Sequence, residues 1–255
     1  MIGWVGGKRL LRKRIIPLIP KHNWYCEPFG GAGWILFAKS NDAKDWKIDN
    51  KPNYREIFND INGDLINFWR YIKYHPDAFH KELEQYMASR ELFKEMIEMK
   101  ARTDLERAVF FYYKLSCSFG GLSRSFALRG GSNIIPLFNK DRVEKASKRL
   151  ANVVIDNLSF EKVITKYDRD FTFFYVDPPY YDKEDVYDRD SVDSFTQHKE
   201  LRELLGKVKG KWLLSYNDHP KVRELYKGYD IQEAETLYSL SGKTIPKTEI
   251  LIKNY

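Results

Sequence analysis

The chain carries the sequence NWYCEPFGGAGWILFA from residue 23 to residue 38. Its first five residues have the apolar and aromatic character of a short strand, the next six form a glycine-rich turn, and a helical pattern follows. Beyond a loop over residues 40–53, whose role the sequence does not explain, residues 54–59 predict a second strand that closes on Asp60. This succession is typical of a parallel α/β sheet, which is the fold class that the sequence predicts.

A second stretch predicts the centre of that sheet. Residues 171–176, FTFFYV, are almost all apolar or aromatic, which is typical of a parallel strand buried on both faces. The run ends abruptly in Asp177-Pro178-Pro179-Tyr180. Because consecutive prolines cannot continue a β-ladder, they predict a stiff turn at the carboxyl end of the strand. Open α/β sheets bind their ligands at this edge.

The four residues of this turn, Asp177, Pro178, Pro179 and Tyr180, are the candidate catalytic residues. The amino nitrogen of adenine is a poor nucleophile because its lone pair is delocalised into the ring. Two acceptors, the Asp177 carboxylate and the Pro178 carbonyl, would hold its two hydrogens and localise charge on the nitrogen. Tyr180 could stack on the base, which contributes roughly 1–3 kcal/mol, once the base is flipped out of a duplex. The alternative interpretation is a rigid proline turn with a helix-capping Asp and a packed Tyr.

The glycine turn predicts a nucleoside site. Glycine lets the backbone turn sharply and approach a ligand closely, so Phe29, Gly31 and Gly33 are candidate cofactor contacts. Asp60, at the end of the next strand, can accept hydrogen bonds from ribose hydroxyls. It lies 27 residues after Gly33 (60 − 33 = 27), which differs from the dinucleotide fingerprint. The pattern fits S-adenosylmethionine better, and a tight turn without a ligand is the alternative.

The middle of the chain has a different character. Residues from about 75 to 116 are mostly helical and charged, whereas residues 117–136 are glycine-rich, basic and aromatic without sustained periodicity. Residues 71–149 as a whole are predicted to be mostly helical. We interpret this region as a subdomain inserted into a sheet domain formed by residues 1–70 and 150–255. The N-terminal sequence WVGGK, residues 4–8, is not a phosphate-binding loop, because it lacks the required first glycine and the final Ser or Thr.

Composition indicates a globular protein with a polyanionic partner. The 255 residues include 43 Lys or Arg and 36 Asp or Glu, a net charge of +7 that fits a nucleic-acid binder but also occurs on ordinary soluble proteins. No apolar run reaches the roughly 18 residues that span a bilayer, and the first residues lack a signal pattern. We therefore expect a cytoplasmic protein without membrane contact. Two cysteines cannot form a disulfide framework, and five histidines fall at no metal-ligand spacing, so we expect no metal.

Together these motifs resemble the Dam-like family of N6-adenine DNA methyltransferases. The match covers most of the chain in the family's order, and it includes residues 4–8, 27–33, 59–66, 121–124, 177–180 and 248–255. The resemblance implies a Rossmann-like S-adenosylmethionine-dependent methyltransferase sheet with an inserted, mostly helical DNA-recognition subdomain. It implies that S-adenosylmethionine donates a methyl group to the exocyclic amino group of an adenine that is flipped out of double-stranded DNA.

The resemblance also assigns cofactor residues. Trp4 and Lys8 would carry the N-terminal cofactor contacts, and Asp60 would contact the ribose. Phe160 would contact the adenine ring, and Asp177 would lie near both the cofactor and the target amine.

The candidate DNA contacts come from the glycine-rich segment. Arg124 could pair with a guanine edge, Phe119 could fill the gap left by a flipped base, and Arg129 could meet phosphate. A solvated or salt-bridged loop residue is the alternative for Arg124.

Two alternatives to adenine methylation remain. Methylation of cytosine N4 or of an RNA base is disfavoured because related proline motifs for those substrates usually begin with Ser or Asn, whereas Asp177 favours adenine. A catalytically silent DNA-binding relative is disfavoured by the intact Asp177, Tyr180, Lys8 and Asp60. We expect a monomer, because a chain that acts on one strand per visit needs no partner.

Overall fold

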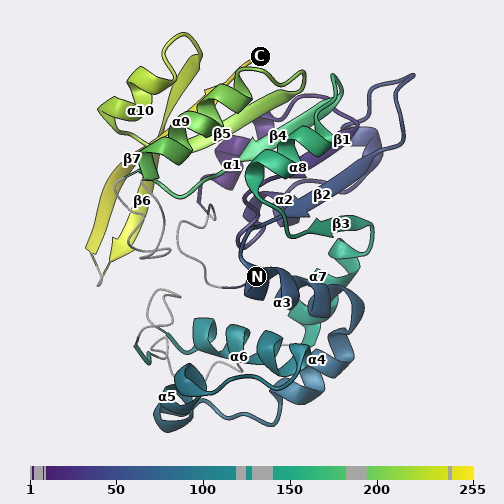
Figure 1. Cartoon of the computed structure of the whole chain (residues 1–255), viewed down its shortest axis with the longest axis vertical. Coiled ribbons are helices and arrows are strands. Elements are labelled where there is room, and N and C mark those ends of the chain that lie inside the picture. Colours follow the sequence, from purple (N-terminus) through teal and green to yellow (C-terminus); the bar gives the residue numbers. More distant parts are fainter. Residues whose placement is uncertain are drawn as a thin grey trace.

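The computed structural model describes residues 2, 8, 10–118, 125–127, 140–181, 194–240 and 243–255, without the side chains of 194–195, 236–240 and 243–247. Within these residues, seven strands form one sheet in the order β3-β2-β1-β4-β5-β7-β6 (Figure 1). The strands are β1 (Trp24–Glu27), β2 (Arg55–Asn59), β3 (Val153–Asp156), β4 (Thr172–Val176), β5 (Lys211–Asn217), β6 (Asp230–Leu240) and β7 (Lys243–Lys253). Strands β1 to β5 pair in parallel, and β7 runs antiparallel to both β5 and β6. The predicted α/β, Rossmann-like fold is confirmed.

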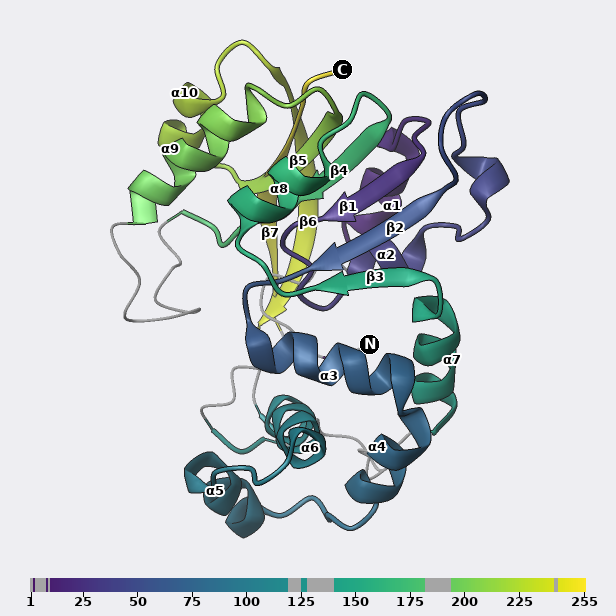
Figure 2. The ribbon, with the colours of Figure 1, turned by 45° about the vertical axis from the view of Figure 1, so that its right-hand side comes forward.

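Helices cover both faces of the sheet (Figure 2). The helices of the described part of the chain are α1 (Arg12–Ile15), α2 (Trp34–Ala38), α3 (Gly63–Tyr74), α4 (Pro76–Leu83), α5 (Arg90–Glu98), α6 (Asp104–Ser116), α7 (Lys140–Leu150), α8 (Phe160–Tyr167), α9 (Ser194–Leu205) and α10 (Pro220–Leu225), with the short 3-10 helices η1 (Ile16–Leu18) and η2 (Ala43–Asp45). All five residues of β4 are buried, as the apolar run predicts. Phe173 and Tyr175 belong to the core beneath α1, α2 and α3, whereas Phe174 and Val176 belong to the core beneath α8, α9 and α10.

The order of the strands creates a switch point between β1 and β4. From β1 the chain adds β2 and β3 on one side, and it then adds β4 and β5 on the other. Connections therefore diverge from the carboxyl ends of β1 and β4, and such a divergence is where open α/β sheets bind ligands. The glycine turn follows β1 and Asp177 follows β4. Both motifs consequently lie at this one edge of the sheet.

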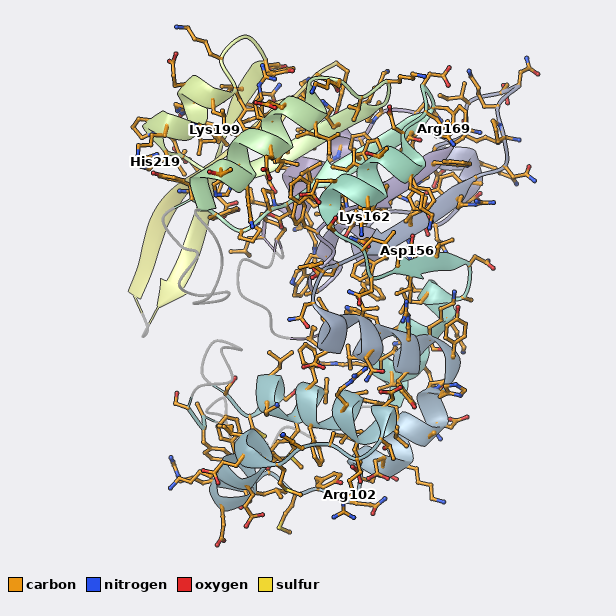
Figure 3. All side chains as sticks on the ribbon, viewed as in Figure 1. Arg102, Asp156, Lys162, Arg169, Lys199 and His219 are labelled. Carbon is orange, nitrogen blue, oxygen red and sulfur yellow. The ribbon has the colours of Figure 1, made fainter. Side chains whose placement is uncertain are left out.

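Helices α3 to α7 form a helical part beside the sheet (Figure 2). Helix α3 packs against α6 and α7, and α4 packs against the same two helices. The helical part shares one hydrophobic cluster with the sheet, since Phe68 and Phe79 belong to the same core as Phe173. Figure 3 labels Arg102 at the far end of the helical part and Arg169 beside the sheet. Because α3 runs through residue 71 without a break, the predicted domain boundary falls inside a helix, and the division into domains stays a prediction.

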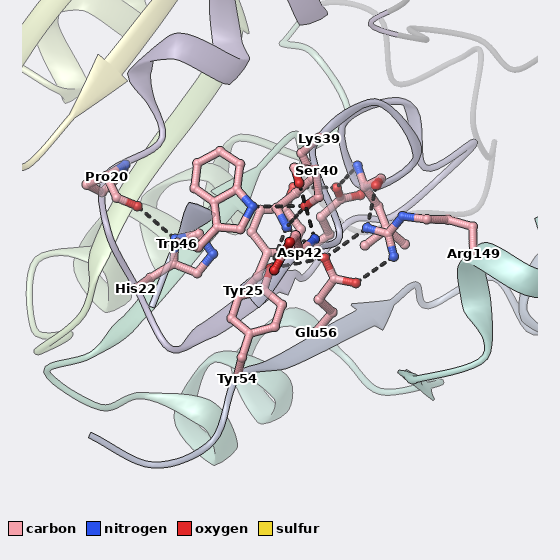
Figure 4. Close-up of polar contacts among 12 residues, drawn as sticks. Pro20, His22, Tyr25, Lys39, Ser40, Asp42, Trp46, Tyr54, Glu56 and Arg149 are labelled. Carbon is pink, nitrogen blue, oxygen red and sulfur yellow. Dashed lines mark hydrogen bonds and ion pairs between the residues drawn. The ribbon is translucent and has the colours of Figure 1, made fainter. Parts of the chain in front are cut away.

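The loop over residues 40–53 closes over the buried ammonium group of Lys39 (Figure 4). The Nζ atom of Lys39 donates to Glu56 Oε1 at 2.7 Å and lies 5.0 Å from the ring centroid of Trp46, which belongs to the loop. Arg149 of α7 donates to both carboxylate oxygens of Glu56. One carboxylate on β2 therefore joins the loop, the sheet and the helical part.

Candidate active site

Asp177 is held by two donors at the carboxyl end of β4. The Nζ atom of Lys8 lies 2.6 Å from Asp177 Oδ1, and the Ser215 hydroxyl of β5 donates to the same oxygen at 3.0 Å. The Asp177 side chain is 18% exposed, whereas that of Lys8 is 2% exposed. Burial raises the pKa of Asp177, Lys8 and the Ser215 hydrogen bond act to lower it, and the nearby carboxylate of Glu249 acts to raise it.

Tyr180 is packed behind Asp177. Its ring is stacked on that of Tyr216, with centroids 5.9 Å apart, and Lys8 Nζ lies 4.5 Å from its centroid. Its hydroxyl donates to the carboxylate of Glu249. Burial raises the pKa of Tyr180 well above the usual range, so the ring carries a neutral hydroxyl. The stacking of Tyr180 on a substrate base stays a prediction.

Glu249 is a buried carboxylate that the sequence analysis did not single out as a site residue. It lies on β7, is fully buried, and is paired in register with Asn217 of β5. Its Oε2 atom is 3.9 Å from Lys8 Nζ, so Lys8 lies between two carboxylates. The available signal was the lone acid at the start of the apolar run of residues 250–252, since a charge is seldom placed in a buried strand without a partner.

The glycine turn has the tight geometry that its composition predicts. A Cβ atom at Gly30 would lie 2.4 Å from the ring of Phe58, so only glycine fits there without a shift. Gly31 and Gly33 have φ angles of 51° and 65°, in the left-handed region that glycine adopts readily. The Gly31 amide donates to Asp60 Oδ2 at 2.9 Å. The turn after β1 is thereby fixed to the residue after β2.

Asp60 organises the backbone around it. Its Oδ1 atom accepts a hydrogen bond from the Asn62 amide at 2.9 Å, while Oδ2 accepts from Gly31. Burial raises the pKa of Asp60, and these backbone hydrogen bonds act against that rise. The neighbouring Asn59 donates to the Pro28 and Leu158 carbonyls and so joins the ends of β1, β2 and β3. A ribose contact by Asp60 stays a prediction.

Two further predicted cofactor residues lie together. The rings of Phe29 and Phe160 are stacked, with centroids 5.5 Å apart and an interplanar angle of 28°. Phe29 follows β1 and Phe160 begins α8 after β3, so the pair lies at the carboxyl-end edge of the sheet on the β1 side of the switch point. Both side chains are half-buried.

Glu27, at the end of β1, is another buried acid that the sequence analysis did not single out. It accepts hydrogen bonds from the Tyr25 hydroxyl at 2.6 Å and from the Leu36 amide at 2.7 Å. Burial raises the pKa of Glu27 to about 8, and the proximity of Asp177 adds to the rise. Its contacts hold α2 against β1.

Of the catalytic turn, Pro178 is buried and Pro179 is half-buried, and a contact of the Pro178 carbonyl with a substrate stays a prediction. The other predicted residues divide into two groups. Lys8 lies on Asp177 as described, so its direct contact with a cofactor stays a prediction. Four others, Trp4, Phe119, Arg124 and Arg129, lie outside the described residues. In the part of the chain that the structure describes, no group of three or more His, Cys, Asp or Glu side chains could hold a metal ion. No helix among the described residues is long and apolar enough to cross a membrane.

Comparison with known proteins decides the family. A family model described as D12 class N6 adenine-specific DNA methyltransferase matches residues 4–240. The chain belongs to this family. It is therefore an adenine-specific DNA methyltransferase, and the predicted resemblance is confirmed.

Relatives of this D12 class methyltransferase are similar over nearly the whole chain. It is 28% identical to the type II methyltransferase M1.LlaDCHI of Lactococcus lactis subsp. cremoris, over 99% of this chain and 94% of that protein. It is 26% identical to the DNA adenine methylase of Haemophilus influenzae, over 98% of this chain and 90% of that protein. Among solved structures, a precorrin-6y C5,15-methyltransferase from Geobacter metallireducens GS-15 covers 97% of this chain and 86% of its own, at 9% identity and a TM-score of 0.42.

Proposed function

We propose that the chain transfers a methyl group from S-adenosylmethionine to the exocyclic amino group of an adenine flipped out of double-stranded DNA, and that Asp177 and Pro178 receive this amine. The observation that carries the proposal is the position of Asp177, which follows a fully buried strand at the switch point, next to the glycine turn. Family membership supports adenine over cytosine or an RNA base.

The residues of the switch-point edge fit a cofactor of this kind. Positive φ angles at Gly31 and Gly33 let backbone approach a ligand closely, the Phe29–Phe160 pair offers apolar ring surface, and Asp60 offers carboxylate oxygens. We assign these five residues, with Lys8 and Trp4, to the cofactor. When bound, S-adenosylmethionine supplies an electrophilic methyl group on a sulfonium.

The chain's own residues activate and orient the amine. The Asp177 carboxylate and the Pro178 carbonyl each accept one hydrogen of the adenine amino group, and these two bonds fix the direction of the nitrogen lone pair. Held at this edge by the residues assigned above, the methyl donor would supply the carbon for a new N–C bond as its C–S bond breaks, and the positive charge that develops on the nitrogen would lie beside Asp177. One N–H proton of the methylated amino group would then pass to solvent water, which leaves a neutral methylated amine. This chemistry needs positioning and charge.

We assign contacts with the duplex to Phe119, Arg124 and Arg129, within residues 71–149. The basic excess of the chain supports a phosphate backbone as partner. A monomer, a cytoplasmic location and a reaction without metal stay predictions.

Incubation with S-adenosylmethionine labelled in the methyl group, with duplex DNA and with RNA in parallel, tests the function. The DNA is digested after the reaction and the labelled nucleoside is identified. We expect the label in N6-methyladenine from DNA. Label in methylcytosine or in RNA alone would show that adenine in DNA is not the substrate. The absence of label from every nucleic acid would overturn the proposed function.

A further inference from the structure

Two buried hydroxyl groups form a chain behind Asp177. Ser215 of β5 is fully buried, and its Oγ atom donates to Asp177 Oδ1 at 3.0 Å. Tyr175 of β4 is 2% exposed, and its hydroxyl lies 2.9 Å from Ser215 Oγ. The register pairs Val176 with Leu214, so Asp177 and Ser215, the next residue on each strand, lie side by side.

The hydrogen bonds of these two hydroxyl groups run in one direction. A serine hydroxyl has one proton to donate, and Ser215 gives it to Asp177. The hydroxyl of Tyr175 must therefore be the donor to Ser215. Burial raises the pKa of Tyr175 well above its usual range, so this hydroxyl keeps its proton. The order of donation is Tyr175 to Ser215 to Asp177.

Both donors to Asp177 reach the same oxygen. Lys8 and Ser215 each contact Oδ1. Within the described part of the chain, no hydrogen bond or ion pair reaches the other oxygen, Oδ2, although the side chain is 18% exposed. Anchoring one oxygen fixes the plane of the carboxylate, because two donors at separate angles leave little freedom to rotate. The other oxygen keeps its acceptor capacity.

We propose that Ser215 and Tyr175 are positioning residues for the methyl transfer, which anchor Asp177 through Oδ1 so that Oδ2 accepts a hydrogen of the adenine amine. This inference rests on the proposed function. Asp177 and the two hydroxyl groups need not reorganise during the reaction, because their hydrogen bonds exist before the substrate binds. Without the two hydroxyl groups, the Asp177 side chain is still present but its carboxylate is free to rotate.

A double-mutant cycle with Ser215→Ala and Tyr175→Phe tests this arrangement. A hydrogen bond to a charged group contributes about 1.5–3 kcal/mol, so we expect kcat to fall about 10- to 100-fold in Ser215→Ala. Tyr175→Phe acts through Ser215 and lowers kcat about 3- to 10-fold. In the Ser215→Ala background, Tyr175→Phe has no further effect, which makes the pair non-additive. The KM for DNA and for the methyl donor stays within about twofold, because Asp177 is oriented and not removed.

The pH profile gives a readout that a purely structural role would not change. The groups that face Asp177 are Lys8, Glu27 of β1, Glu249 of β7, Tyr175 and Tyr180. Ser215→Ala leaves all five of these groups in place, and the double variant changes only Tyr175 among them. Because the Ser215 hydrogen bond lowers the pKa of Asp177, its removal moves the acid limb of the kcat profile to higher pH.

Two matched controls remove buried hydroxyl groups that are not part of this network. Thr172→Val removes a buried hydroxyl at the other end of β4, where it donates to the Tyr167 carbonyl at 2.7 Å. Tyr226→Phe removes a buried tyrosine hydroxyl that has no hydrogen-bond partner among the described residues. Both controls should keep kcat within about threefold of wild type, since neither hydroxyl is connected to Asp177.

The outcomes separate this inference from the proposed function. The inference alone would be overturned if the wild-type protein methylates adenine and the kcat of Ser215→Ala lies within twofold of the wild-type value. Additive effects of the two substitutions on kcat would also overturn it. Wild-type protein without transfer would overturn the proposed function. If circular dichroism shows that Ser215→Ala does not fold, the comparison of Tyr175→Phe with Tyr226→Phe tests the inference. Equal kcat values of those two variants would overturn the positioning role of the two hydroxyl groups.

Discussion

Asp177 differs from an ordinary surface aspartate in three ways. It follows a fully buried strand, it has an ammonium group 2.6 Å from one oxygen, and a second carboxylate, Glu249, lies behind that ammonium group. Lys8 offsets the cost of burying two acids so close together. The acid is therefore held in place by charge and by hydrogen bonds before any substrate binds.

Replacement of this acid tests the chemistry at the residue scale. Asp177→Asn keeps the size of the side chain but removes its charge, so we expect kcat to fall about 100-fold or more. The control is Asp170→Asn, before the same strand, whose exposed ion pair with Lys51 contributes little. Initial rates with labelled methyl donor measure both. Retention of more than about a tenth of wild-type turnover in Asp177→Asn would contradict a catalytic role.

The raised pKa of Glu27 predicts that the stability of the protein depends on pH. Its pKa is about 8 in the folded protein and near 4.5 in the unfolded chain, so the folded state binds the extra proton between these values. Its contribution to stability is complete below about pH 4.5 and is lost as pH rises through 8. Glu27→Gln cannot titrate, so its stability relative to wild type should rise by at least about 1 kcal/mol from pH 5 to pH 8. Urea unfolding at several pH values measures the difference, and a constant difference would contradict the buried titration.

At the scale of the elements, the turn after β1 depends on the close approach of glycine to a ring. Gly30→Ala would place a methyl group 2.4 Å from the buried Phe58. We expect a loss of about 1–3 kcal/mol in the free energy of unfolding and weaker binding of S-adenosylmethionine, since the turn must shift. Gly63→Ala is the control, because the added methyl group lies 3.7 Å from its nearest neighbour at the start of α3. Equal stability of the two variants by urea unfolding would show that the turn yields freely.

The strands near the site were predictable where the chain itself carries the signal. The apolar run over residues 171–176 and the double proline after it predicted β4 and its turn, because few other structures accommodate that sequence. The predicted strands at residues 23–27 and 54–59 correspond to β1 and β2 within one residue.

The partners of Asp177 were not predictable from local pattern. Ser215 reaches Asp177 because β5 pairs with β4, and Glu249 reaches Lys8 because β7 inserts between β5 and β6; both pairings are set by tertiary packing. Ser215 stands in the run Leu213-Leu214-Ser215-Tyr216, where nothing local separates a packed hydroxyl from a functional one. The burial of Glu27 could not be predicted from the sequence either, because it depends on how α2 packs over this residue.

At the scale of the whole molecule, one buried carboxylate joins the sheet to the helical part. Glu56 accepts from Lys39 and from Arg149, and the Lys39 and Arg149 side chains are 0% and 12% exposed. Those two cations keep the pKa of Glu56 below its usual value despite burial. Arg149 also donates to the Leu36 carbonyl in α2, so α7, α2 and β2 meet at this carboxylate. We infer that it fixes the helical part relative to the sheet.

Glu56→Gln tests this junction. Two buried cations would lose their counter-ion, and we expect the free energy of unfolding to fall by about 3 kcal/mol. The exposed pair of Glu233 and Arg223 supplies the control, because Glu233→Gln should change stability by less than about 0.5 kcal/mol. Urea unfolding at neutral pH compares the two. A loss below about 1 kcal/mol in Glu56→Gln would mean that packing alone holds the helical part in place.

The most direct measurement is a crystal structure of the protein with duplex DNA and a non-reactive analogue of the methyl donor. The proposed function predicts an adenine outside the duplex, with its amino nitrogen within about 3 Å of Asp177 Oδ2 and of the Pro178 carbonyl oxygen. It also predicts that Ser215 and Lys8 remain on Asp177 Oδ1. An extruded base bound away from Asp177, or a DNA complex with every adenine still stacked in the duplex, would contradict it.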